Sequence, residues 1–94
     1  MNLKSGDLAI IVASREPSHI GNLVCVLQCF GDLGLPVYSV RSATLLWERR
    51  PWTWSYSFYF AEGELCALPG FEVIDLDRFI VKAARSNERL GEAA

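Results

Sequence analysis

The side chains in this sequence that could do chemistry are three cysteines, one histidine and eleven carboxylates. Cys25 and Cys29 are four residues apart, and on an extended strand that spacing separates the sulfur atoms by about 13 Å. Two thiols so far apart cannot share a metal ion or form a disulfide. His19 has no thiol at a spacing that would give a cysteine nucleophile with an orienting group. The sequence also has no glycine-rich phosphate loop. We therefore expect no catalytic, metal-binding or cofactor-binding residues, and no enzyme.

The clearest pattern is the alternation of aromatic and mostly polar residues over 52–60. A period of two predicts a strand with one aromatic face. A small barrel cannot hold five large rings from one strand in its interior, so a helix or a partner must cover some of them. Tryptophan and tyrosine are enriched in the energetically dominant part of protein interfaces. The predicted partner-binding residues are Arg49, Arg50, Trp52, Trp54, Tyr56 and Tyr59.

Arg49, Arg50 and Pro51 precede Trp52, so two guanidinium groups stand beside an aromatic residue in the sequence. Such a pair could bind phosphate next to a stacked base, or a carboxylate on a protein. A plainer interpretation is a solvated strand end whose charges discourage pairing with other strands. The nucleic-acid alternative uses Arg15, Arg41, Arg49 and Arg50.

Turn residues and short apolar runs divide most of the chain into strands. The run at 8–13 lacks alternation, which predicts burial on both of its faces. Residues 43–50 are open between a strand end and a short helical turn. The other expected strands are 22–30, 37–42, 52–60, 65–68 and 71–74.

The segment after the last predicted strand has the spacing of an amphipathic helix. Its apolar residues follow the i, i+3, i+4, i+7 pattern, and Asp75 or Asp77 could cap its start. The stripe consists of Leu76, Phe79, Ile80 and Ala83. We expect a helix over about 75–90 that packs on the aromatic strand.

Length and composition limit the class of protein. A chain of 94 residues suffices for one domain, here 1–94, with a barrel over about 5–74 and the helix after it. A hydrophobic content of 51% excludes disorder, and a net charge of −2 is unlike that of a dedicated nucleic-acid binder. The odd number of cysteines suggests free thiols in a reducing cytoplasm. No signal peptide and no apolar run of membrane-spanning length is visible.

The segments Gly6–Val12 and Ile20–Leu27 resemble a KOW-type hairpin, in which Gly-Asp opens an apolar strand and a glycine starts the next. The resemblance implies an SH3-like barrel. The order of elements, with Leu76–Ile80 after the last strand, is also similar to that of small uncharacterised proteins of phages and proteobacteria. The loop of the KOW family is usually basic, whereas this loop carries Glu16 beside Arg15.

These observations predict a mainly β protein, a small SH3-like barrel of five or six antiparallel strands with one C-terminal α-helix. We expect a non-catalytic, cytoplasmic protein-binding or adaptor module without a cofactor. The resemblance narrows this role to a phage or prophage accessory protein that modulates a host protein or defence system. The alternative is a KOW-like nucleic-acid-binding protein. A homodimer formed by sheet extension is a further expectation.

Overall fold

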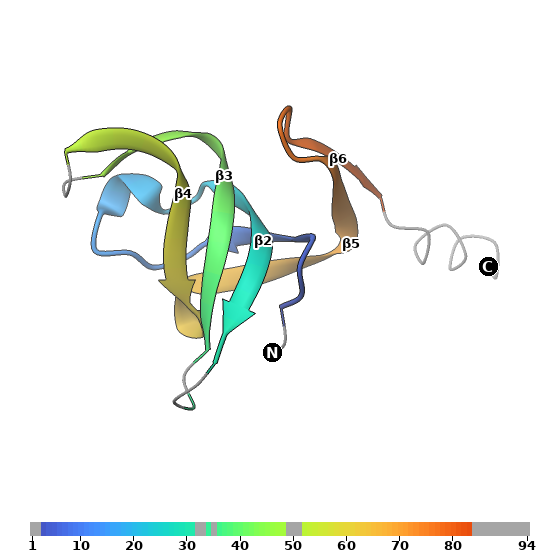
Figure 1. Ribbon diagram of the computed structural model, residues 1–94, viewed down its shortest axis with the longest axis horizontal. Helices are drawn as coiled ribbons and strands as arrows, with labels where there is room; N and C mark the ends of the chain where they lie inside the picture. Colours follow the sequence, from blue (N-terminus) through green and yellow to red (C-terminus); the bar gives the residue numbers. More distant parts are fainter. Residues whose placement is uncertain (1–2, 32–33, 35, 49–51, 84–94) are drawn as a thin grey trace, which may run out of the picture.

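A computed structural model describes residues 3–31, 34, 36–48 and 52–83. This part of the chain forms one sheet of six antiparallel strands in the order β4-β3-β2-β1-β5-β6 (Figure 1). The strands are β1 (Asp7–Ile11), β2 (Leu23–Phe30), β3 (Val37–Glu48), β4 (Thr53–Ala61), β5 (Leu65–Asp75) and β6 (Ile80–Ala83), and the 3-10 turns are η1 (Pro17–His19) and η2 (Glu62–Glu64). The mainly β class is confirmed. Within the described residues the sheet is not closed, because β4 and β6 form its two ends without pairing to each other.

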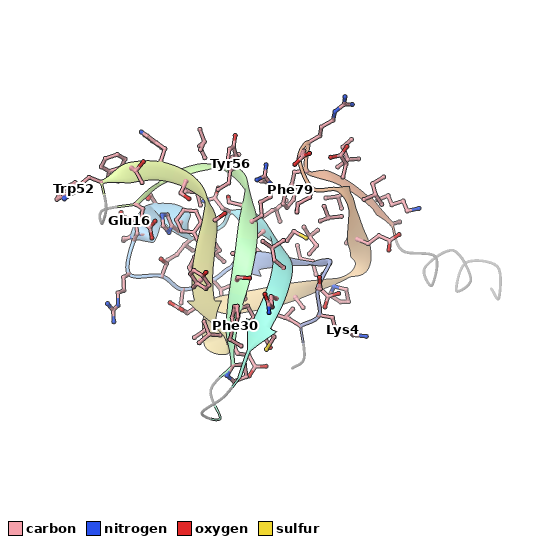
Figure 2. The ribbon with its side chains drawn as sticks, in the orientation of Figure 1. Lys4, Glu16, Phe30, Trp52, Tyr56 and Phe79 are labelled. Carbon is pink, nitrogen blue, oxygen red and sulfur yellow. The ribbon has the colours of Figure 1, made fainter. Side chains whose placement is uncertain are left out.

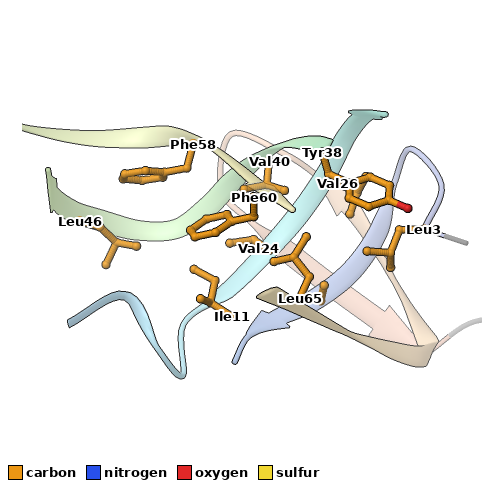
Figure 3. Packing of buried hydrophobic residues seen from close by; sticks show 11 residues of the cluster. Leu3, Ile11, Val24, Val26, Tyr38, Val40, Leu46, Phe58, Phe60 and Leu65 are labelled. Atoms are coloured by element: carbon orange, nitrogen blue, oxygen red, sulfur yellow. The ribbon is translucent and has the colours of Figure 1, made fainter. Parts of the chain in front are cut away.

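The sheet curves around a core on one side, which we call its inner face (Figure 3). Val24 and Val26 of β2 and Val40 of β3 are fully buried there. Alternate residues of a strand point to opposite faces, so the neighbours of these valines lie on the outer face. The core consists of Leu3, Ala9, Ile11, Val24, Val26, Tyr38, Val40, Leu46, Phe58, Phe60 and Leu65.

The central strand β1 has buried residues on both faces, but the run predicted over 8–13 is buried only in part, because β1 ends at Ile11 and Val12 is 48% exposed. Ala9 and Ile11 belong to the inner core, and Leu8 on the opposite face is also only 4% exposed. Pairing with β2 and with β5 makes β1 an interior strand of the sheet, and the core cluster covers its inner face.

The structure settles the ambiguous segment 43–50 in part. Residues 43–48 are strand and extend β3 to Glu48, and residues 49–50 lie outside the described residues. The register between β3 and β4 shifts between Arg41 and Leu46, so the long hairpin is irregular there. Such irregularities bend a strand and increase its twist.

The predicted helix over 75–90 is wrong for the part that the structure describes. Asp75 accepts a hydrogen bond from the backbone N–H of Arg78 at 3.0 Å, which closes a turn rather than starting a helix. Phe79 then adopts a φ of +53°, outside the helical region. Ile80 and Val81 are β-branched and form β6 against β5. Residues 84–90 of the prediction lie outside the described residues.

Candidate interaction surface

The aromatic residues of β4 do not share one face, contrary to the prediction. Leu46 belongs to the inner core and pairs with Ser55, so Ser55 faces inward. Trp54 therefore faces outward, whereas Phe58 and Phe60 belong to the inner core. The alternation breaks between these two parts of the strand.

A local hydrogen bond marks the break in β4. The backbone N–H of Ser57 donates to Oγ of Ser55 at 3.0 Å, and Ser55 Oγ in turn donates to the Ser57 carbonyl at 3.2 Å. A serine side chain that bonds the backbone two residues along in this way competes with the hydrogen bonds between strands. The two serines thus divide the strand into an outward aromatic half and an inward aromatic half.

The three tryptophans of the protein gather at the outer end of the β3–β4 hairpin. The ring of Trp47 lies 5.5 Å from that of Trp54 and 6.3 Å from that of Trp52, measured between centroids. Trp52 is 68% exposed and Trp54 is 60% exposed. Figure 2 shows Trp52 at the far end of this hairpin. We call these three residues the tryptophan surface.

Trp52 also has an unusual backbone. Its φ is +63°, in the left-handed region that costs a residue with a Cβ about 1 kcal/mol or more. Strained residues of this kind concentrate at sites of function, where other demands outweigh the local cost. Burial of the Trp52 ring does not compensate for this backbone strain, because most of the side chain faces solvent.

His19 fastens the loop between β1 and β2 to this hairpin. Its Nε2 lies 2.7 Å from the backbone oxygen of Trp47, and since a carbonyl only accepts, Nε2 is the donor. The imidazole is 4% exposed and packs edge-to-face on Phe58 with ring centroids 4.9 Å apart. His19 is therefore a structural residue that supports the backbone beneath the tryptophan surface.

An open pocket of about 680 Å³ lies between this loop and the inner side of the hairpin. Three of its lining residues are carboxylates and one is an arginine, so the charges present disfavour a phosphate group. One carboxylate also has a structural task, since Glu64 Oε1 accepts the Ala61 N–H at 2.9 Å. The lining consists of Ser14, Arg15, Glu16, His19, Glu48, Phe58, Tyr59, Phe60 and Glu64.

Arg41 does not join a basic patch with Arg15. Its guanidinium lies 4.7 Å from the centre of the Tyr56 ring and donates to the Leu76 carbonyl at 2.9 Å and the Asp77 carbonyl at 3.4 Å. Arg15 lines the pocket on the other side of the sheet.

The remaining predicted residues are spread out. Arg49 and Arg50 lie outside the described residues. Tyr59 is 70% exposed and packs near Phe30, with ring centroids 6.2 Å apart. Trp54 is five residues earlier on β4, about 16 Å away along a strand. The structure therefore brings Trp52 and Trp54 together and leaves Tyr59 apart.

Two residues of this region were not predicted as site residues. Trp47 lies in the segment whose secondary structure is ambiguous in sequence, so its face could not be assigned. A strand through residue 48 would have placed Trp47 on the face opposite Leu46. His19 carries no sequence signal, because its partner Trp47 is 28 residues away.

Comparison with protein-family models, with curated proteins and with solved structures found no match. Among the described residues, no three histidine, cysteine or acidic side chains are grouped so that they could hold a metal ion. The described residues also include no helix whose length and apolar character would let it cross a membrane.

Proposed function

We propose that this chain is a non-catalytic protein-binding module, built as a small SH3-like barrel, and that the tryptophan surface contacts the partner. One observation carries the proposal: two tryptophans more than half exposed lie around a third at one end of the molecule. Exposed tryptophan is unfavourable in water and is enriched where partners bind. The left-handed backbone of Trp52 adds support, because nothing in its burial accounts for it.

The strand order supports the barrel part of the proposal. The chain passes along β1, β2, β3 and β4 as neighbours, and β5 then returns to pair with the other edge of β1. The resemblance to KOW-type proteins implies an SH3-like barrel, and the curved sheet with this return supports that fold. The narrower role, as a phage or prophage accessory protein that acts on a host protein, stays a prediction, as does the cytoplasmic location.

The nucleic-acid alternative receives less support from the described residues. Arg41 already donates to two backbone carbonyls, and Arg15 shares its pocket with three carboxylates. A phosphate-binding groove needs cations that converge on one path.

The test is affinity capture from a lysate of the native host with three baits: the wild-type chain, Trp54→Ser and Tyr59→Ser. Tyr59→Ser is the matched control, since it removes a ring of similar exposure from the same strand, away from the tryptophan surface. We expect wild type and Tyr59→Ser to recover the same discrete protein, and Trp54→Ser to recover about ten-fold less of it.

Nuclease treatment separates the two functions. Recovery of the partner should be equal with and without nuclease. Recovery that depends on nucleic acid would favour the KOW-like alternative, and equal recovery by Trp54→Ser would remove the tryptophan surface from the proposal.

A further inference from the structure

We propose that the β5–β6 hairpin over residues 71–83, called the arm below, opens and closes over the outer face of the sheet. Pro69–Gly70 is the hinge of this movement. Arg41 is the latch, the residue that holds the arm in the closed position. This device is independent of the proposed function, since it concerns how the chain covers part of its own sheet.

The hinge is an interruption within β5. Ala9 of β1 pairs with Ala67, but Asp7, only two residues earlier, pairs with Glu72. Between these two pairings, β5 therefore has three more residues than β1. Gly70, in this stretch, has a φ of +89°, a conformation that residues with a Cβ rarely adopt. Figure 1 shows the arm beyond this point projecting from the rest of the sheet.

The latch is the side chain of Arg41 on β3. It lies on the outer face, because its neighbours Val40 and Ser42 are buried on the inner side. Its guanidinium donates to the carbonyls of Leu76 and Asp77, which belong to the turn of the arm. The turn is thereby held to a strand that is not its neighbour in the sheet.

A buried row of side chains lies between the hinge and the latch. Leu8, Cys25 and Arg41 are direct cross-strand partners on β1, β2 and β3, so they share the outer face. Leu8 is 4% exposed and Cys25 is 3% exposed, although neither belongs to the inner core. Glu72, near the start of the arm, pairs with Asp7 at one end of this row, and the turn of the arm binds Arg41 at the other end.

The arm is joined to the rest of the sheet by the pairing of Glu72 with Asp7 and by the hydrogen bonds of Arg41. A two-stranded hairpin alone is marginally stable in water. The ion pair between Lys82 and Glu72 joins the two strands of the arm to each other and does not hold the arm to the sheet; at 3.7 Å and about half exposed, it also adds little to the hairpin. Ile74 at 55% and Phe71 at 49% exposure are incompletely covered in the closed position. Opening the arm should therefore need less free energy than unfolding the sheet.

Cys25 provides the test, because it is the buried thiol and the other two cysteines are exposed. In a chain carrying Cys29→Ser and Cys66→Ser, a thiol reagent such as a dithiobisnitrobenzoate reports only on Cys25. Arg41→Met keeps an unbranched side chain beside Cys25 but donates no hydrogen bond. We expect this variant to react with the reagent at least about ten-fold faster than the parent.

The matched control is Arg78→Gln, which alters an arginine of the arm's turn that is not the latch. Its Cys25 should react at the parental rate. The dependence of the rate on urea should be weaker than that of global unfolding, because opening the arm exposes less surface. A rate unchanged by Arg41→Met, or a urea dependence equal to that of global unfolding, would overturn the proposal.

Native-state hydrogen exchange of the wild-type chain gives a second measurement that does not depend on a variant folding. Backbone amides of β6 and of 71–75 should exchange through one common opening of lower free energy than the amides of β1 and β2. Exchange of the arm only with global unfolding would likewise overturn the proposal.

Discussion

His19 and Trp47 are joined by a 2.7 Å hydrogen bond from the imidazole Nε2 to the backbone carbonyl, across 28 residues of sequence. The bond connects the loop after β1 to the end of β3, immediately beneath the tryptophan surface. The same imidazole packs against Phe58 and Phe60 of the core. One buried side chain thus links the loop, the core and the candidate interaction surface.

Replacing His19 with alanine should destabilise the fold by about 2–4 kcal/mol. The substitution leaves a cavity beside Phe58 and removes the donor that satisfies the Trp47 carbonyl. Urea unfolding followed by tryptophan fluorescence measures the change. Ser18→Ala, at the exposed neighbouring position, is the control and should cost less than about 0.5 kcal/mol.

Phe58→Ala and Trp54→Ala should differ sharply although both shorten an aromatic residue of β4. Phe58 is 4% exposed in the core, and its truncation should cost about 3–5 kcal/mol. Trp54 is 60% exposed, and its truncation should cost less than about 1 kcal/mol. The free energies of unfolding of the two variants measure this difference. An equal loss of stability in both would show that Trp54 is a packing residue instead.

Trp52→Gly should be more stable than Trp52→Ala by about 1 kcal/mol. Both variants lose the ring contact with Trp47, but only glycine adopts a φ of +63° without strain. The difference in melting temperature between the two variants therefore isolates the backbone cost. An alanine variant as stable as the glycine variant would mean that the turn relaxes when the indole is removed.

The fold should lose stability at alkaline pH. Burial, together with the negative charge of Asp7, raises the pKa of the Cys25 thiol from 9.0, and burial raises the pKa of the Tyr38 phenol from 10.0. The unfolded chain ionises these groups first, so their stabilising contribution is complete below pH 9 and is lost as pH rises through the higher folded values.

Urea unfolding at a series of pH values from about 7 to about 11 measures this loss. Cys25→Ala should reduce the fall in the free energy of unfolding above pH 9, where the thiol of the unfolded chain ionises. A profile for Cys25→Ala that parallels the wild type would contradict a role for this thiol.

Removing two side-chain caps should promote self-association. β4 is an edge strand without a charged residue, a type of edge that tends to pair with other strands. The backbone N–H groups of Ser57 and Ala61 are bound by Ser55 Oγ and Glu64 Oε1, which withholds them from a second chain. Ser55→Ala combined with Glu64→Ala should shift the sedimentation profile toward dimers or larger species.

Glu64→Gln is the control for this prediction, since glutamine keeps an oxygen that can accept the Ala61 N–H. The homodimer by sheet extension that the sequence suggests would, in contrast, already be present in the wild type. A wild-type dimer that pairs through β4 would contradict the capping role of Ser55 and Glu64.

Local sequence patterns sufficed for most strands. The runs at 8–13 and 22–30 are apolar and β-branched, and their strands follow from propensity and length. The helix over 75–90 shows where such reasoning fails. Leu76, Phe79, Ile80 and Ala83 fit a helical stripe, but a turn closed by Asp75 and pairing with Phe71–Val73 override the spacing.

The candidate surface was predictable only in part. That some aromatic residues of 52–60 lie outside the core follows from having too many of them for one small core, but which ones do so does not follow from the sequence. The change of face at Ser55 does not, because it depends on a serine hydrogen bond and on a register shift in the neighbouring strand. Whether Trp47 joins the tryptophan surface depends on where β3 ends, and no local sequence pattern predicts that end.

The pairing of β1 with β5 has a consequence for the order in which the chain can fold. Leu65 pairs with Ile11, which precedes it by 54 residues, so β1 lacks one of its two neighbours until β5 has left the ribosome. The β2–β3–β4 meander can form earlier from pairings closer in sequence. During that interval the core side of Phe58 and Phe60 has no β5 residue such as Leu65 to pack against. Ribosome-bound chains from which β4 but not yet β5 has emerged should therefore be the forms that most need a chaperone.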